Sequence, residues 1–468
     1  MIDIMLIGLG QHATHRHFKA LQILEDHSLA RCTVVVDIAS AKDRVGDYLK
    51  KCGKDKLEVI YIPDDERDFE SLSDETAAKL NEAAARLGIS HVIIATEAKA
   101  HYAYIEWAVR QGFDFLTDKP IFSETYEEVK KLGRSGMYAR FVRIGDEIAR
   151  KGINASVLVP RRMNPAYMMM RAYLADFVKE FGVPVTHLNF YHGEGMWNMP
   201  DEFFTRENHP YKYGYGALFH TGYHFVDLIN YFLSVNEQIG YDRYDTADLA
   251  ISVANPSDVC RMVGEEAYEK LIGVHSLQSF AKNMAPLGEV DLMMLFNLYA
   301  SGNLSATCSI DLRQSDYCSR KSRTLPADLL KGNGRTYHEL LVIEVPHLLK
   351  LCLSRMTVGD AENKERYSHK ADYYVQIYRN HYLTGGDAYE EIVFPYQMEI
   401  MVNGDLVKTE LGNVTRYNII YDWLFNQSRN TSYESHRRSM QLFDEVQSLT
   451  AELHNTGTAM GMRHAAGL

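Results

Sequence analysis

The first residues whose types and spacing point to chemistry are three small residues near the start of the chain. Gly8, Gly10 and Ala13 form a G-x-G-x-x-A turn between the apolar run 4–7 and a helical stretch at 17–24. The first glycine permits a tight turn, the second lets backbone approach a pyrophosphate, and the small third residue lets the helix pack on the strand. The unpaired N–H groups and the dipole at the helix start attract phosphate. This pattern predicts a dinucleotide-binding turn.

A carboxylate stands where the ribose beside the adenine would need one. Asp37 ends a second apolar run, 33–36, and lies 24 residues after Ala13. An acidic side chain at that position binds the ribose hydroxyls of NAD and repels the 2′-phosphate of NADP. No arginine follows Asp37 until Arg44, so we expect NAD rather than NADP. The alternative is a glycine turn of another α/β protein, in which Asp37 caps a helix.

The elements that must carry these residues alternate between strand and helix over the first third of the chain. We expect strands at 57–62, 91–96 and 113–117 and helices at 41–51, 76–87 and 102–111. Such alternation predicts a parallel sheet with helices on both faces, which binds ligands at the carboxyl ends of its strands. Thr96 and Lys119 stand at two such ends, on the same edge as the glycine turn. We therefore expect Lys119 to face the cofactor.

The remainder of the chain predicts a second domain. Residues 290–299 and 303–312 alternate apolar and polar side chains around a short Ala-Ser-Gly connection, which is typical of a β-hairpin. We expect an α/β fold with an N-terminal Rossmann dinucleotide-binding domain at 1–152. A C-terminal α/β domain with a largely antiparallel open sheet is expected at 153–468.

Three later segments complete the prediction. The amphipathic helix expected at 437–454 could pack back on the first domain. The segments 236–288 and 316–396 carry no motif that we can interpret.

Composition limits the class of protein. The chain has 468 residues, is 46% hydrophobic and 24% charged, and carries a formal net charge of −12. This charge argues against a nucleic-acid surface, which needs a basic patch. Six scattered cysteines without a CxxC pair fit reduced thiols in a cytoplasmic protein. We expect no signal peptide and no membrane helix, because no run approaches the roughly twenty apolar residues that a membrane helix needs.

Four further motifs follow the glycine turn in order. They are Asp-Lys-Pro at 118–120, RRMNP at 161–165, GYGALFHTGYHFVD at 214–227, and Ser-Tyr-Glu at 432–434 before the last helix. With the glycine turn and Asp37, this ordered set resembles the glucose–fructose oxidoreductase/inositol 2-dehydrogenase family (Gfo/Idh/MocA). That family usually has Glu-Lys-Pro and a G-G-G-x-L-x-D-x-G-x-H-x-x-D segment at the corresponding places.

The resemblance implies an NAD(P)-dependent enzyme that oxidises or reduces a secondary alcohol or ketone of a sugar, polyol or related compound. Lys119 would lie near the nicotinamide and stabilise the developing alkoxide, and His224 would be the general base. Expected cofactor-binding residues are Gly8, Gly10, Gln11, His12, Ala13, Asp37, Thr96, His101 and Lys119. Expected substrate-binding residues are Arg162, Trp197, Arg206, Tyr211, Lys212 and His220.

His220 is the main departure from the family pattern, which commonly has Asp or Asn four residues before its histidine. His220 could replace that acid as a substrate-binding group or proton relay, and we include it among the catalytic residues. It could instead form a metal pair with His224 at i, i+4, but no H-E-x-x-H motif supplies further ligands, so we expect no metal site. The third possibility is that the dehydrogenase chemistry has been lost or redirected.

Two other functions stay open. One is an NAD-dependent glycoside hydrolase or lyase of the same fold, in which the cofactor ends the cycle unchanged. The other is a non-catalytic sensor of NAD or sugar. For any of these, we expect a small carbohydrate or polyol ligand and a homo-oligomer, dimer or tetramer, formed through the C-terminal sheet.

Overall fold

A computed structural model describes residues 1–10, 12–206, 209–241, 244–274, 283–320, 333–360, 371–426 and 430–468. The chain forms two compact units, each made of three segments. Unit 1 contains Met1–Ser123, Met137–Pro165 and Gln397–Arg437, and unit 2 contains Glu124–Gly136, Ala166–Tyr396 and Arg438–Leu468. The expected boundary after residue 152 stays a prediction, and the compact units alternate along the chain several times.

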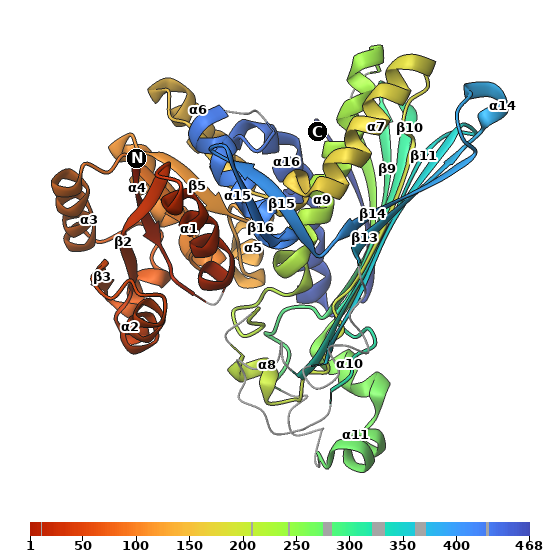
Figure 1. Cartoon of the computed structure of the whole chain (residues 1–468). Helices are drawn as coiled ribbons and strands as arrows, with labels where there is room; N and C mark the ends of the chain where they lie inside the picture. The colour runs from red at the N-terminus through yellow and green to blue at the C-terminus, as the bar shows by residue number, and fades with distance from the viewer. Residues whose placement is uncertain are drawn as a thin grey trace. The chain divides into compact units, whose positions relative to one another are not determined.

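Unit 1 is built on a six-stranded sheet in the order β3-β2-β1-β4-β5-β6, with every neighbouring pair parallel. Its strands are β1 (Ile2–Ile7), β2 (Ala30–Ile38), β3 (Glu58–Ile62), β4 (His91–Ile94), β5 (Asp114–Asp118) and β6 (Ala155–Leu158). The order runs from β1 toward β3 in one direction and from β1 toward β6 in the other (Figure 1). A doubly wound sheet binds its ligand outside this reversal, at the carboxyl ends of β1 and β4.

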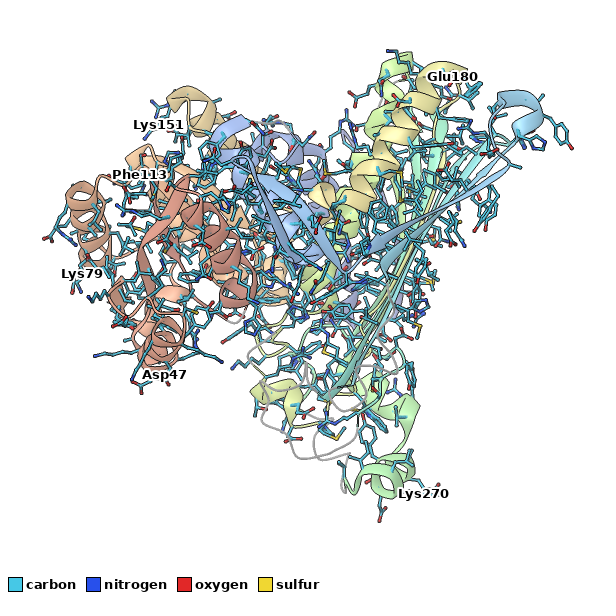
Figure 2. The ribbon with its side chains drawn as sticks, in the orientation of Figure 1. Asp47, Lys79, Phe113, Lys151, Glu180 and Lys270 are labelled. Carbon is cyan, nitrogen blue, oxygen red and sulfur yellow. The ribbon has the colours of Figure 1, made fainter. Side chains whose placement is uncertain are left out.

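Helices cover this sheet because its strands are apolar on both faces. Residues 4–7 of β1 and 34–36 of β2 are at most 1% exposed. The helical elements of unit 1 are η1 (Ala13–His17, a π-helix), α1 (Phe18–Asp26), η2 (Ala39–Ala41), α2 (Lys42–Lys51), η3 (Asp64–Asp68), α3 (Asp74–Leu87), η4 (Ala98–Ala100), α4 (His101–Gln111), α6 (Met137–Lys151), η5 (Pro160–Met163), α15 (Leu411–Tyr421), η9 (Asp422–Asn426) and η10 (Tyr433–His436). Asp47 on α2 and Lys79 on α3 lie on the exposed sides of their helices (Figure 2).

The small hairpin β15 (Gln397–Val402) and β16 (Asp405–Glu410) completes unit 1.

Unit 2 is built on a nine-stranded sheet in the order β14-β13-β12-β11-β7-β10-β9-β8-β17. Only the β7–β10 pair is parallel. The strands are β7 (His187–Gly193), β8 (Thr246–Ala254), β9 (Asp291–Ala300), β10 (Asn303–Arg313), β11 (Asn333–Val345), β12 (Leu349–Asp360), β13 (Ala371–Arg379), β14 (Tyr389–Pro395) and β17 (Met460–Ala466). The predicted fold class and the 300–302 hairpin are confirmed.

One face of the nine-stranded sheet is packed and the other is open. On β9, Met294 and Phe296 are at most 1% exposed, whereas Met293 and Leu295 are 38% and 49% exposed. Alternation of this kind is typical of an antiparallel sheet with one covered face. The helices of unit 2 are α5 (Tyr126–Leu132), α7 (Pro165–Phe181), α8 (Glu202–Thr205), η6 (Leu218–Gly222, a π-helix), α9 (Tyr223–Leu233), η7 (Ser234–Ile239), α10 (Pro256–Val263), α11 (Glu265–Ile272), α14 (His381–Thr384) and α16 (Arg437–Thr456).

The ends of this long sheet carry short helices. α14 caps one end and α10 and α11 lie at the other (Figure 1). The expected final helix is confirmed as α16, and Ser135 of the 124–136 segment donates a hydrogen bond to Asp444 of α16. Across the described ranges, no helix combines the length and apolar character needed to cross a bilayer.

Gly8 is the position in unit 1 where a side chain is least tolerable. Its φ is +89°, and a Cβ there would lie 2.7 Å from the Ala95 carbonyl oxygen. Gly8→Ala should therefore lower the free energy of unfolding by roughly 2–4 kcal/mol. Urea unfolding followed by circular dichroism measures this. The control is Gly46→Ala in α2, where nothing lies within 4 Å, and it should stabilise by about 0.5–1 kcal/mol. Equal effects of the two substitutions would contradict this account.

Candidate functional site

The glycine turn is held between two neighbouring strands and leaves room for a ligand. Gly8 N–H donates to the Val36 carbonyl of β2 and Ala95 N–H donates to the Ile7 carbonyl of β1, both at 2.8 Å. A Cβ at Gly10 would have no heavy atom within 4 Å. Backbone with open space above it fits a pyrophosphate. Ala13 is buried at the start of η1 and His12 is exposed, whereas the predicted cofactor residue Gln11 lies outside the described residues.

Asp37 is tied to the same turn. Its carboxylate accepts hydrogen bonds from Leu9 N–H at 3.0 Å and Ile38 N–H at 2.8 Å. Arg44 also reaches this carboxylate, at 3.3 Å from Oδ2, and donates to the Leu9 carbonyl. The carboxylate is therefore fixed at the end of β2, with a guanidinium at its side. Arg44 is close enough to bear on the choice between NAD and NADP.

His101 joins the loops that follow β4 and β5. It is 1% exposed, and its ring nitrogens lie 2.8 Å from the Pro120 carbonyl oxygen and 3.1 Å from the Thr96 carbonyl oxygen. Burial lowers the pKa of His101, although the nearby Asp118 charge acts in the other direction. His101 thus braces the backbone at the predicted cofactor residue Thr96 and at Pro120, which follows Lys119. Lys119 itself is half-buried, and its N–H donates to Asp118 Oδ1 at 2.8 Å.

Arg162 was predicted to bind substrate, and the structure places it inside unit 1. It is 4% exposed. Its guanidinium donates to the Asn430 carbonyl at 2.7 Å and to Ser435 Oγ at 2.9 Å. These contacts attach η5 to the segment that leads into η10. Arg162 therefore stabilises the local fold of unit 1. A role in substrate binding stays a prediction.

The remaining predicted substrate residues all belong to unit 2. Arg206 is 1% exposed and donates to Asn198 Oδ1 at 3.1 Å. Tyr211 is fully buried, and its ring lies edge-on to that of His220 with centroids 5.2 Å apart. Trp197 packs edge-on against Tyr268 of α11. Lys212 lies over the Tyr213 ring, with its Nζ 5.3 Å from the centroid.

His220 and His224 lie one turn apart where η6 passes into α9, and both are buried. His220 Nε2 lies 3.2 Å from the Pro210 carbonyl oxygen, and its Nδ1 lies 3.4 Å from Gln314 Nε2. A neutral ring suits both contacts, because Nε2–H donates to the carbonyl and Nδ1 accepts from the amide. Burial, reinforced by the charges of His209 and Arg206, lowers the pKa of His220 well below its ordinary value. This arrangement favours a neutral positioning group.

A set of charged residues near His220 was not predicted from the sequence. Glu194 follows β7 and forms an ion pair with Arg335 of β11, and Glu339 of β11 lies 3.1 Å from His192 Nδ1. Glu194 Oε2 lies 3.7 Å from His209 Nδ1, and the His209 ring stacks on His220 at 4.8 Å. Burial raises the pKa of Glu194, but the Arg335 charge and the two histidines outweigh it, so the pKa is well below the ordinary value.

We call this set, together with Arg206, Tyr211 and Gln314, the buried polar cluster. Among the described residues, Tyr211 Oη and Gln314 Oε1 of this cluster have no hydrogen-bond partner. Buried polar atoms left unpaired are costly, so they indicate bound water or a polar ligand. In the sequence, the placement of His192 and Glu194 on either side of Gly193 gave only a weak indication of this cluster.

The state of His220 predicts how stability depends on pH. Below about pH 6.5 the unfolded chain takes up a proton at this position that the folded chain does not bind, so unfolding becomes easier as the pH falls. When the pH falls from 7 to 5, the free energy of unfolding should fall by up to about 2 kcal/mol more in the unchanged chain than in His220→Gln. Urea unfolding at both pH values measures the two losses. Equal losses would show that His220 is protonated in the folded chain.

Comparison with known proteins agrees with this geometry. Residues 2–135 match the Gfo/Idh/MocA family, described as an oxidoreductase family with an NAD-binding Rossmann fold. A search of curated proteins finds no match.

Three solved structures illustrate the shared fold. KijD10, a 3-ketoreductase from Actinomadura kijaniata solved with NADP and TDP-benzene, is 14% identical, with a TM-score of 0.56 and coverage of 95% of this chain and 96% of its own. Levoglucosan dehydrogenase with NADH and levoglucosan is 12% identical, with a TM-score of 0.57 and 99% coverage of both chains. GenD2 from gentamicin A biosynthesis, solved with NAD, is 11% identical, with a TM-score of 0.54 and coverage of 99% and 96%. The family match therefore covers the N-terminal part of the chain, residues 2–135, and the three solved structures share the fold of the whole chain.

Proposed function

We propose that the chain transfers hydride between NAD and a secondary alcohol or ketone of a sugar, polyol or related compound. The observation that carries this proposal is the glycine turn of unit 1, with open space at Gly10 and the carboxylate of Asp37 fixed beside it. The family match over the same residues supports the class of reaction.

The buried polar cluster of unit 2 supports the substrate class. A substrate rich in hydroxyl groups offers both donors and acceptors, which is what the unpaired atoms of Tyr211 and Gln314 require. The similar structures solved with levoglucosan or a TDP derivative agree with a carbohydrate-like ligand. We include Arg206, Trp197, Lys212 and His220 in the proposed substrate site.

Lys119 and His224 are the proposed catalytic residues. Bound NAD would supply the hydride acceptor. The Lys119 ammonium would donate a hydrogen bond to the reacting oxygen and stabilise the developing alkoxide. The His224 imidazole would take the hydroxyl proton during oxidation and return it during reduction. His101 would act indirectly, by holding the two loops that carry Thr96 and Lys119.

We also propose that the chain forms a homo-oligomer through the open face of its nine-stranded sheet. Large apolar side chains on that face are exposed, including Leu295 at 49% and Met356 at 44%. Exposed apolar patches on a sheet mark interaction surfaces. The six cysteines are all free, which supports a reducing compartment such as the cytoplasm.

Substitution of the two catalytic residues tests the reaction. With a panel of sugars and polyols followed at the NADH absorbance band, Lys119→Ala and His224→Ala should each lower kcat by about 10²–10⁴-fold, because each group acts on charge or protons in the transition state. Lys79→Ala, an exposed lysine of α3, is the matched control and should leave kcat unchanged. Substrate consumption without net NADH change would support the hydrolase or lyase, and binding of NAD or sugar without any turnover by the unchanged chain would support the sensor.

Substitution of Asp37 tests the choice of coenzyme. We expect the unchanged chain to bind NAD at least about 10-fold more tightly than NADP, because the carboxylate repels a 2′-phosphate. Asp37→Ser should reverse or abolish this preference, since it removes that charge and frees Arg44 to meet the phosphate. Fluorescence titration with NADH and NADPH measures both affinities. Tighter binding of NADPH by the unchanged chain would show that Arg44 dominates.

A further inference from the structure

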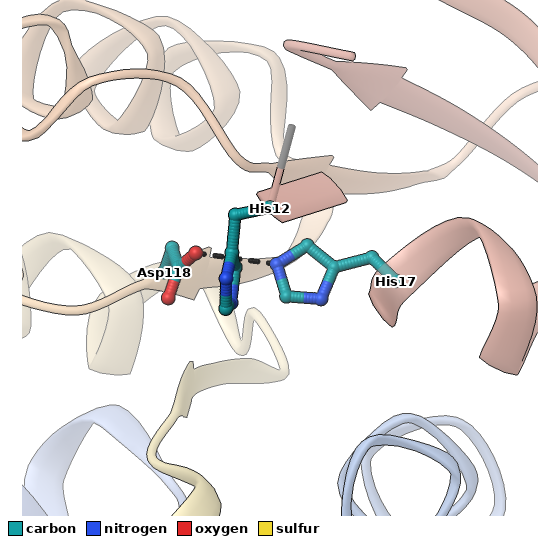
Figure 3. A group of neighbouring side chains, drawn as sticks. All are labelled: His12, His17 and Asp118. Atoms are coloured by element: carbon teal, nitrogen blue, oxygen red, sulfur yellow. Dashed lines mark hydrogen bonds and ion pairs between the residues drawn. The ribbon is translucent and has the colours of Figure 1, made fainter. Parts of the chain in front are cut away.

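Three side chains with metal-ligating atoms gather beside the glycine turn. His12 precedes η1, His17 ends it, and Asp118 ends β5, so two elements distant in sequence supply them. One ligand atom from each lies within 4.8 Å of the other two. Figure 3 shows the three side chains converging, with the His17–Asp118 contact drawn across the His12 ring. No other group of three such residues gathers in this way within the described ranges.

The distances suit ligands of one ion. His17 Nε2 and Asp118 Oδ2 are 3.2 Å apart. Tetrahedral zinc with ligands at about 2.0–2.1 Å separates neighbouring ligand atoms by roughly 3.3 Å. His12 is exposed, and its ring lies edge-on to the His17 ring with centroids 5.1 Å apart, so it stands beside the His17–Asp118 pair. Two imidazoles and one carboxylate form a donor set that first-row divalent transition metals prefer.

The surroundings hold two of the three ligands in place. Asp118 Oδ1 accepts the Lys119 N–H at 2.8 Å, which leaves Oδ2 directed at His17. The His17 ring is fully buried, so it has little freedom to turn away. Burial raises the pKa of the Asp118 carboxyl, but the hydrogen bond from His17 and the charges of His17, His12 and Lys119 outweigh it and lower the pKa overall. The geometry thus holds Asp118 Oδ2 facing His17 Nε2 at 3.2 Å.

We propose that His12, His17 and Asp118 form a three-ligand binding site for a divalent transition-metal ion, represented by Zn²⁺. This proposal departs from our expectation from the sequence that the chain has no metal site. Three protein ligands leave a coordination position for water or a phosphate oxygen. Because His12 lies two residues after Gly10, an ion here would offset the Asp118 charge beside the phosphate-binding turn. The proposal depends only on these residues of unit 1 and not on the proposed reaction.

Titration with Zn²⁺ alone tests the site. The full chain without a histidine tag, stripped with EDTA, should bind close to one equivalent of Zn²⁺ by isothermal calorimetry. His12→Ala should weaken this binding at least about 10-fold, since losing a ligand costs no less than losing an outer-shell partner. Asp118→Asn, which keeps the oxygen that accepts the Lys119 N–H, should weaken it similarly. Co²⁺ binding should give visible absorption that both variants lose.

His15→Ala is the matched control. His15 is exposed in the same π-helix but is not part of the group, so its removal should leave the affinity unchanged. Thermal unfolding without metal confirms that each variant is folded. The proposal is overturned by the absence of stoichiometric binding, by equal losses in His12→Ala and His15→Ala, or by unchanged affinity in Asp118→Asn. Any of these results would make the group a hydrogen-bonded brace. Dinucleotide binding is measured separately, so its failure would concern the proposed function alone.

Discussion

The structure of unit 1 depends on the close contact between the glycine turn and the end of β4. Gly8 can approach the Ala95 carbonyl only because it has no side chain, and its positive φ turns the chain sharply out of β1. Hydrogen bonds from the turn to β2 and from Ala95 to β1 then fix three strand ends together. This one junction fixes the positions of Asp37, Thr96 and the Gly10 backbone.

A second layer of contacts fixes the loops around that junction. His101 spans the Thr96 and Pro120 carbonyls, and Arg162 spans the Asn430 carbonyl and Ser435. Both are residue types that often act in catalysis. Here the His101 ring contacts two backbone carbonyls, and the Arg162 guanidinium donates to a carbonyl and to a serine hydroxyl. A site on parallel-strand loops needs such braces because loop backbone has no ladder of its own to satisfy its carbonyls.

The sequence predicted the elements whose periodicity is strong. β1, β2 and the hairpin of β9 and β10 were predicted because Ile, Val and Leu mark their buried faces clearly. β13 was missed because tyrosines stand on both of its faces. Tyr373 is 6% exposed and Tyr378 is 42% exposed, and tyrosine tolerates both environments.

The candidate site was predictable only in part, for a related reason. The glycine turn and Asp37 are local in sequence, so their spacing carries the information. Glu194 and Arg335 meet because β7 pairs with β11, with Gly193 opposite His338. No local pattern contains that pairing. His220 was recognised as unusual, but residue type alone could not show that Pro210 and Gln314 are its partners.

The interleaved connectivity of the two units has a consequence for synthesis on the ribosome. The core of unit 1 includes Val402, Tyr417, Ile420 and Trp423, and Trp423 exchanges hydrogen bonds with the backbone and side chain of Asn154. These residues emerge more than two hundred positions after β6. During synthesis, the Rossmann sheet therefore keeps an apolar patch exposed until most of unit 2 has been translated. An excised fragment that ends near residue 152 would keep that patch exposed permanently and would tend to aggregate.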